Sequence, residues 1–518
     1  MRSIRLRILV ICAVLVAVGV GAWQLLPATS AKKKDAIAVG TTDEVTSLDP
    51  AGAYDAGSWA MYSNVFQSLL TFKQGASLPV PDAAKSCRWL GTDLTSYGCE
   101  LRDDLTFSNG RGITAEDVKY SFDRMMGIKA DAGPSSLFPT LKSVSAQGRS
   151  VTFKLSARDA TFPQKVATGA GSIVDREHYP RTSLREGTGV DGSGPYVLRK
   201  FEVGGDAELE PNPRYKGALV KQGGPVTVRY YKDSDDMADA WKAHRIDVAH
   251  RQMPPEFIAD MDRTKDGVRV TEADSAEIRN LVFNVRKGAP LAKRAVRQAV
   301  ASVVDRQKIA GSVYHSTVEP LYSLIPQGFL GHTTSFFDRY PQPDAKEAKE
   351  LLRDAGVQTP VRFTLAHRDG ETYAAEAAEL KRELDATGLF EVTVKPVAWK
   401  TFLQEYARGT YDAFTVGWLP DFPDSDSFTQ PLVSSGNSMH NGYASKAVDG
   451  LIQTTQQYGE RSQAVQDFKA IQQEVAKDVP LLPLWQKKDY VLSSGDVAGS
   501  QYLTDGTGIW RLWELSWL

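Results

Sequence analysis

A chain of 518 residues is too long to fold around one compact core, and its length predicts about three domains. Its 42% hydrophobic and 24% charged residues are ordinary for a soluble globular protein. The net charge is −2, but residues 1–34 hold six basic and no acidic side chains, which leaves −8 on the rest. The negative charge on residues 35–518 would repel the phosphate backbone of nucleic acid. We therefore do not expect nucleic acid as a partner.

Residues 1–31 are predicted to direct export, either as a signal peptide or as an N-terminal membrane anchor. Arginines precede an apolar run over residues 8–22, the pattern of a secretory signal, and small residues before Ala31 offer a cleavage site. If the run extends to Leu26, it reaches the length that spans a bilayer, and the arginines would keep its start in the cytoplasm. Both alternatives export the body. No cysteine follows the run, so there is no lipobox cysteine to acylate.

Ile37–Gly40 predicts a short buried strand, and a helix is expected over Ser58–Leu70. Thr114 and Asp117 form a helix-start box, because the threonine hydroxyl can cap a helix whose third residue is acidic. Further strands are predicted at residues 151–155, 194–198, 207–210 and 226–231, and a helix begins at Ser234.

Cys87 and Cys99 lie on the two arms of a predicted hairpin, on either side of turn-forming glycines. In an oxidising compartment outside the cytoplasm we expect them to form a disulfide. A closed loop of this size would stabilise the fold by roughly 3 kcal/mol in the chain-entropy model. Two buried free thiols are the alternative. A zinc site is not expected, because no histidine or third cysteine is near.

The second half of the chain continues the alternation of helices and strands. A long amphipathic helix is expected over Ala292–Ile309, and its basic residues, Arg297 and Arg306 among them, are expected to face solvent. The later predicted elements are a helix from Asp344 to Gly356, strands at 361–365 and 392–397 around a helix near 373–387, and strands at 481–485 and 490–492. Alternating strands and helices predict α/β lobes with mostly covered sheets.

Two short motifs suggest catalysis but lack the context that catalysis requires. Residues 187–192 fit a dinucleotide-binding glycine pattern, yet no strand precedes them and no helix follows. His367-Arg368-Asp369 is similar to a kinase catalytic loop, but the required asparagine and the glycine-rich phosphate loop are missing. A catalytic triad assembled from distant residues stays open.

Residues 417–424, Gly-Trp-Leu-Pro-Asp-Phe-Pro-Asp, directly follow a strand-like run over 411–416. Two prolines in eight residues suit a rigid corner better than a core element. Such a corner would present Trp418 and Asp421 outward, and a carboxylate beside aromatic faces can hold a cation such as a free amino terminus. A plain surface turn with a solvated Asp421 is the alternative.

Several sequence blocks occur in a fixed order over nearly the whole chain after residue 36. The blocks are Glu44–Pro50, Leu105–Gly110, Thr114–Phe122, Gly192–Tyr196, Phe283–Asn284, Ala295–Ala299, Asp344–Ala348, Trp399–Leu403, Gly417–Trp418, Asp421 and Asn441–Ser445. Each block is weak alone, but the ordered set resembles the extracytoplasmic solute-binding proteins of ABC importers. Within that class it is similar to the oligopeptide/dipeptide/nickel-binding family, family 5.

The resemblance implies an α/β, three-domain periplasmic-binding-protein-like fold. Two lobes would close by a hinge around a ligand, and an extra domain would be attached. The implied boundaries are 37–72, 190–280 and 487–518 for the discontinuous domain I, 73–189 for domain II and 281–486 for domain III. The ligand would lie between domains I and III.

The resemblance also implies a ligand site. Asp421 would accept the α-ammonium of a peptide whose backbone adds as an extended strand. The other implied site residues are Glu44, Val45 and Thr46 from domain I and Trp399, Trp418 and Leu419 from domain III. Core packing for Trp399 and a solvated loop position for Glu44 are the alternatives. Pro420 departs from strand pairing because it has no N–H, whereas Leu419 can still donate.

The function that the resemblance implies is capture of short peptides outside the cell membrane and delivery to an ABC permease by a monomeric receptor. No catalytic residue, metal ligand or cofactor is expected. The alternatives are a binder of another solute (a metal chelate, haem or an oligosaccharide), a membrane-tethered sensor or chaperone, and a secreted hydrolase. A hydrolase would need an activated nucleophile in the cleft.

Overall fold

The computed structural model describes residues 36–219, 223–263, 267–504 and 509–518. Every contact given below lies within the unit Ile37–Leu518. Residues 1–31, where a signal peptide or an anchor is predicted, lie outside the described residues. Within the described ranges, no helix is both long and apolar enough to cross a membrane.

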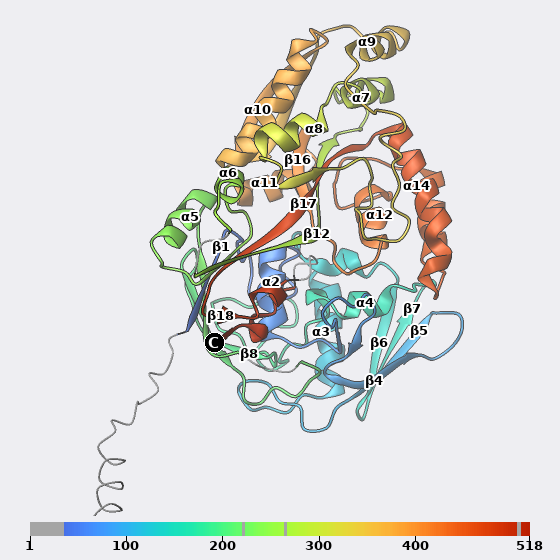
Figure 1. The fold of residues 1–518 in the computed structure, drawn as a ribbon. Helices are drawn as coiled ribbons and strands as arrows, with labels where there is room; N and C mark the ends of the chain where they lie inside the picture. The colour runs from blue at the N-terminus through green and yellow to red at the C-terminus, as the bar shows by residue number, and fades with distance from the viewer. Residues whose placement is uncertain (1–35, 220–222, 264–266, 505–508) are drawn as a thin grey trace, which may run out of the picture. The chain divides into compact units, whose positions relative to one another are not determined.

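Eleven strands of the described residues form one mixed sheet (Figure 1). Their order is β15-β14-β16-β12-β17-β11-β1-β10-β9-β8, and β13 (Val318–Pro320) pairs with β17. The long antiparallel neighbours β12 (Val268–Phe283) and β17 (Leu481–Ser494) lie near its middle. The predicted boundaries between domains I and III fall inside these two strands. Two paired strands therefore join the halves of the sheet, as expected for a connection by chain crossings.

One half of the sheet begins with β1 (Ile37–Thr41), which is fully buried and runs parallel to β10 and β11. Its other elements are β8 (Tyr196–Phe201), β9 (Asp206–Pro211), β10 (Val226–Tyr230), β11 (Val248–His250), α2 (Ala56–Val65), α5 (Ser234–Lys242) and α6 (Pro255–Ala259). The helix predicted over Ser58–Leu70 begins two residues earlier, because Asp55 caps it, and ends at Val65, because the chain turns extended at Phe66.

The other half contains β14 (Val361–Arg368), which runs parallel to both β15 (Phe390–Val397) and β16 (Ala413–Trp418). Its helices are α7 (Arg294–Ala301), α8 (Arg306–Lys308), α9 (Ala345–Asp354), α10 (Glu371–Ala386), α11 (Trp399–Ala407), α12 (Asp426–Val433), α13 (Lys446–Thr455) and α14 (Val465–Asp478). The carboxyl ends of β14 and β16 therefore lie side by side, which is where α/β sheets place their ligands.

A separate four-stranded antiparallel sheet has the order β4-β5-β7-β6. Its elements are β4 (Ala84–Trp89), β5 (Ser96–Leu101), β6 (Leu141–Gln147) and β7 (Ser150–Leu155), with α3 (Ala115–Ile128) and α4 (Phe162–Val166). Cys87 and Cys99 are direct partners on β4 and β5 and form the expected disulfide. Two short strand pairs, β2 (Leu70–Thr71) with β3 (Val80–Pro81) and β18 (Val497–Ala498) with β19 (Ser516–Trp517), complete the strands.

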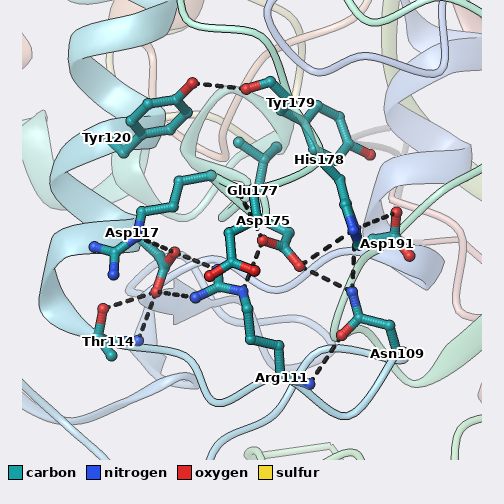
Figure 2. A network of polar contacts seen from close by, with 12 residues as sticks. Asn109, Arg111, Thr114, Asp117, Tyr120, Asp175, Glu177, His178, Tyr179 and Asp191 are labelled. Carbon is teal, nitrogen blue, oxygen red and sulfur yellow. Dashed lines mark hydrogen bonds and ion pairs between the residues drawn. The ribbon is translucent and has the colours of Figure 1, made fainter.

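A polar network around Arg111 fixes the start of α3 (Figure 2). Arg111 Nε donates to Asp175 Oδ1 at 2.7 Å, and its guanidinium also pairs with Asp117. Asp117 accepts the Thr114 N–H at 2.9 Å, so the predicted helix-start box is confirmed. Asn109 Nδ2 donates to Asp175 Oδ2 at 2.8 Å. This network gives a structural reason for the residues at 105–122 that carry the family resemblance.

The prediction of one long helix over Ala292–Ile309 is wrong. Helix α7 ends at Ala301, and a separate short helix, α8, follows it. Arg297 and Arg306 are not solvated but only 5% and 2% exposed. Arg297 donates to main-chain carbonyls at the end of α14, and Arg306 Nε donates to the Pro483 oxygen at 2.7 Å. Unpaired carbonyls attract both guanidinium groups into the interior.

Candidate functional site

A cavity of about 1120 Å³ opens beside the carboxyl ends of β14 and β16. Its walls include the loop after β1, the residues around the start of α2, helix α11 and the corner at 417–421. All seven predicted site residues line this one cavity: Glu44, Val45, Thr46, Trp399, Trp418, Leu419 and Asp421. Their role toward a ligand stays a prediction.

The corner at residues 417–424 is fixed by side chains on both of its flanks. Trp418 Nε1 donates to the Ser427 carbonyl oxygen at 2.8 Å. Phe422 is 2% exposed and packs into the core of the four-stranded sheet. The buried Asp424 carboxylate accepts two hydrogen bonds from the Arg461 guanidinium, at 2.7 and 2.8 Å. The corner is therefore a rigid wall of the cavity rather than a solvated surface turn.

Asp421 is half-buried in the cavity wall and accepts a hydrogen bond from the Tyr54 hydroxyl at 2.7 Å. Removal from bulk water raises the pKa of Asp421 to about 7, although Tyr54 and the charge of Lys165 act to lower it. Within the described residues, no basic side chain forms an ion pair with Asp421. A carboxylate without a counter-charge, facing a cavity, is suited to a cationic ligand group.

The loop of Glu44, Val45 and Thr46 passes close over the start of α2. A Cβ atom at Gly57 would lie 2.3 Å from the Glu44 carbonyl oxygen, so a glycine is required for this approach. The Thr46 N–H donates to Ser58 Oγ at 3.0 Å. The side chains of Glu44 and Thr46 are exposed toward the cavity that they line. The Thr46 hydroxyl donates to Asp55, so the fixed loop leaves the Glu44 side chain to lie alongside an extended ligand.

Helix α11 contributes an aromatic wall. The rings of Trp399 and Phe402 are stacked at 5.7 Å between centroids, and those of Phe402 and Tyr406 at 6.3 Å. Phe402 is buried, whereas Trp399 is only half-buried, so Trp399 serves the cavity as well as the core. The Arg368 guanidinium lies over the Trp399 ring, 5.1 Å from its centroid. The cation–π contact holds a positive charge at the end of β14.

Five arginines line the cavity, and Arg185, Arg251 and Arg279 are already paired with carboxylates. Arg279 Nε donates to Glu376 at 2.9 Å, and Arg251 lies 3.3 Å from Asp43 and 3.8 Å from Glu277. Arg368 forms no ion pair with a carboxylate of the described residues and packs on aromatic rings instead. It is therefore a cation open to an anionic ligand group.

A charge network crosses between β12 and β17 at the floor of the cavity. Glu277 of β12 faces both Arg251, at 3.8 Å, and Lys487 of β17, at 3.5 Å. Burial acts to raise the pKa of Glu277, but these two cations hold it below its usual value. Further along β17, Asp489 faces His250 at 3.1 Å. The paired charges fix the two strands at the level of the cavity.

The sequence did not single out Tyr54 or Arg368 as site residues. Tyr54 belongs to no motif, and its partner Asp421 is 367 residues away in the chain. Arg368 lies in the His-Arg-Asp triplet that resembles a kinase loop, and its first two residues form the end of β14 instead. A cation shortly after the strand predicted at 361–365 was the available signal for Arg368.

Residues 79–440 match the family model of the bacterial extracellular solute-binding proteins, family 5, middle region. The chain belongs to this family. The solute-binding protein is 25% identical, over 499 residues, to a probable D,D-dipeptide-binding periplasmic protein of Escherichia coli K12, with 91% of this chain and 92% of the relative covered. It is 24% identical, over 481 residues, to the periplasmic oligopeptide-binding protein of Salmonella typhimurium LT2, with 85% of each covered.

Solved structures share the fold of this solute-binding protein. A dipeptide-binding protein of a Pseudoalteromonas species in complex with Met-Leu matches with a TM-score of 0.83 at 17% identity, covering 93% of this chain and all of the other. A periplasmic binding protein of Helicobacter pylori in complex with the peptide STSA matches with a TM-score of 0.82 at 19% identity, covering 93% and 98%. These matches confirm the predicted α/β periplasmic-binding-protein-like fold, and the family match confirms a solute-binding protein that acts outside the cytoplasm.

Proposed function

We propose that this solute-binding protein captures short peptides with a free amino terminus. The observation that carries the proposal is the Asp421 carboxylate, which lines the cavity without a basic partner among the described residues. A peptide ammonium supplies the missing charge and three N–H donors. The names of the two sequence relatives, a dipeptide binder and an oligopeptide binder, favour the same class of ligand.

Arg368 supplies a positive charge in the same cavity. It ends β14, and the corner bearing Asp421 follows the end of β16, which is the parallel neighbour of β14. A guanidinium binds a carboxylate through two parallel hydrogen bonds. The cavity therefore offers an anion for the amino terminus and a cation for the carboxyl terminus of a zwitterionic peptide.

The volume of the cavity suits a peptide rather than an amino acid. A cavity of about 1120 Å³ exceeds the ~300–1,000 Å³ that is usual for drug-sized ligands. The aromatic rings of Trp399 and Trp418 offer apolar contact without reading a particular side chain. The main chain at Leu419 can donate to an extended ligand, whereas Pro420 interrupts further pairing.

We further propose that the exported protein works as a monomer and passes its peptide to an ABC permease. The N-terminal 31 residues would export it as a signal peptide or hold it at the membrane as an anchor. Domains I and III, with the boundaries predicted from the sequence, would close on the peptide, and the binding energy would favour the closed state. No catalytic step is part of this function.

Native mass spectrometry of the exported body, purified without denaturation, tests the proposal. Release of the bound molecules should give a set of peptide masses, and their range gives the accepted lengths. A single chelate, haem or sugar mass would contradict the proposal and assign another ligand class. A cavity that stays empty with a library of di- to hexapeptides would also contradict it. Turnover of the added peptides would indicate a hydrolase instead.

A further inference from the structure

Tyr54 and Asp421 meet across the cavity from segments 367 residues apart. Tyr54 lies directly before α2 and donates its hydroxyl to Asp421 Oδ2 at 2.7 Å. The Tyr54 ring is held by two tryptophans, with its centroid 5.3 Å from that of Trp59 and 6.4 Å from that of Trp418. Two aromatic contacts fix the ring, so the direction of its hydroxyl is also fixed.

This hydrogen bond occupies one side of the carboxylate and leaves the other for a ligand. An ionised carboxylate offers about four lone-pair positions. Among the described side chains, only Tyr54 donates a hydrogen bond to Asp421, through Oδ2. Because a phenol is neutral, it orients the carboxylate without neutralising its charge. The second oxygen, Oδ1, stays free to accept from a group in the cavity.

We propose that Tyr54 is the positioning residue of the amine site, and that capture of a primary ammonium at Asp421 is coupled to the release of one proton. The proposal rests on the proposed function and adds to it a pH dependence and a residue that sets it. The ligand keeps the three protons of its ammonium group, and the carboxyl proton of Asp421 leaves to solvent. An ion pair replaces a neutral acid, so the charges balance.

The charged groups around Asp421 do not supply its counter-charge. Lys165 of α4 is close enough to lower the pKa of Asp421, but its ammonium pairs with Asp159 at 2.8 Å. Tyr406, which faces Tyr54, donates to a main-chain carbonyl. The remaining charged groups of the adjoining segments are held by their own partners: Arg461 by Asp424, Asp426 by Gln456, and Asp55 by Thr46 and Ser58.

The sign of the coupling follows from the two states of Asp421. In the free protein its pKa is about 7, chiefly because the cavity removes it from water. A bound ammonium favours the ionised form and lowers that pKa. Below pH 7 binding must therefore expel a proton, and affinity falls by up to tenfold for each further pH unit. Above pH 7 affinity levels off until the peptide's own amino group, with a pKa of about 7.7–8.0, loses its proton.

Titration calorimetry of the full exported body with di-, tri- and tetra-alanine tests the proposal. Affinity is measured at pH 5.5, 6.5 and 7.5. At each pH the titration is repeated in two buffers of different ionisation enthalpy, and the difference in binding enthalpy gives the number of protons released. Wild type is compared with Tyr54→Phe and Asp421→Asn. Tyr120→Phe is the matched control, because Tyr120 is also half-buried and donates to one main-chain carbonyl but lies outside the cavity.

We expect wild type and Tyr120→Phe to release close to one proton per bound peptide at pH 5.5. Their peptide affinity should be at least about tenfold higher at pH 7.5 than at pH 5.5. Tyr54→Phe should move the midpoint of this dependence to higher pH, because the hydroxyl lowers the pKa of Asp421. Asp421→Asn should release no proton. Peptide binding without proton release, or an unmoved midpoint in Tyr54→Phe, would overturn this inference and leave peptide capture standing. Failure of all three peptides to bind at every pH would overturn both proposals.

Discussion

The Arg461 guanidinium and the Asp424 carboxylate form a two-fold hydrogen-bonded pair behind the cavity wall, at 2.7 and 2.8 Å. The side chains are 10% and 7% exposed. Arg461 comes from the segment before α14, and Asp424 ends the corner that carries Asp421. The position of the cavity-facing Asp421 carboxylate therefore depends on a pair that lies outside the cavity lining.

Arg461→Met should lower the free energy of unfolding by about 3–5 kcal/mol, because it leaves the Asp424 carboxylate buried without a partner. Urea denaturation measures this change. The double variant Asp424→Asn/Arg461→Met removes both charges and should recover part of the loss. A single variant as stable as wild type would show that the pair does not hold the corner.

Arg297→Met should also destabilise the fold, by about 2 kcal/mol or more, because Arg297 satisfies carbonyls at the end of α14. The matched control is Arg294→Met on the same helix, whose side chain is 54% exposed and whose partner Asp478 lies 3.3 Å away at the surface. The control should change stability by no more than about 0.5 kcal/mol. Equal effects in both variants would contradict a buried structural role for Arg297.

Cys87→Ser/Cys99→Ser should reduce stability by about 3 kcal/mol, since the disulfide closes a loop between adjacent strands. The cysteines lie on β4 and β5, away from the cavity lining, so peptide affinity should change less than twofold. Thermal unfolding measures the stability, and titration calorimetry measures the peptide affinity. A large loss of affinity in a folded double variant would contradict this separation of stability from binding.

Arg368→Gln should weaken binding of peptides with a free carboxyl terminus by about 10- to 100-fold, because a charge-assisted pair is worth about 1.5–3 kcal/mol. Peptides amidated at the carboxyl terminus should bind wild type and variant alike. The exposed Arg408, which also lines the cavity, provides the control variant Arg408→Gln. Equal losses for free and amidated peptides would place the carboxylate elsewhere.

The sequence identified the family, the fold and seven cavity residues, because the blocks that carry them are local in the chain. It did not identify Tyr54, since the Tyr54–Asp421 contact exists only after segments 367 residues apart have folded together. An amphipathic pattern predicts solvent exposure for Arg297 and Arg306, because it reflects polarity and not the carbonyls to which a guanidinium can donate. The sequence predicts two strands at 481–485 and 490–492, yet the polar residues between them continue β17, where Lys487 pairs with Glu277.

The amino-terminal contact of the peptide at Asp421 is the central claim, and a double-mutant cycle tests it most directly. Calorimetry at pH 7.5 would compare wild type and Asp421→Asn, each with tri-alanine and N-acetyl-tri-alanine, with Asp131→Asn as the control for an exposed acid in the same cavity. We predict that the variant and the acetyl group each weaken binding by about 30-fold or more, equivalent to 2 kcal/mol, and that together they weaken it little further. Full additivity, or wild-type affinity in Asp421→Asn, would contradict the assignment of Asp421 to the peptide's amino terminus.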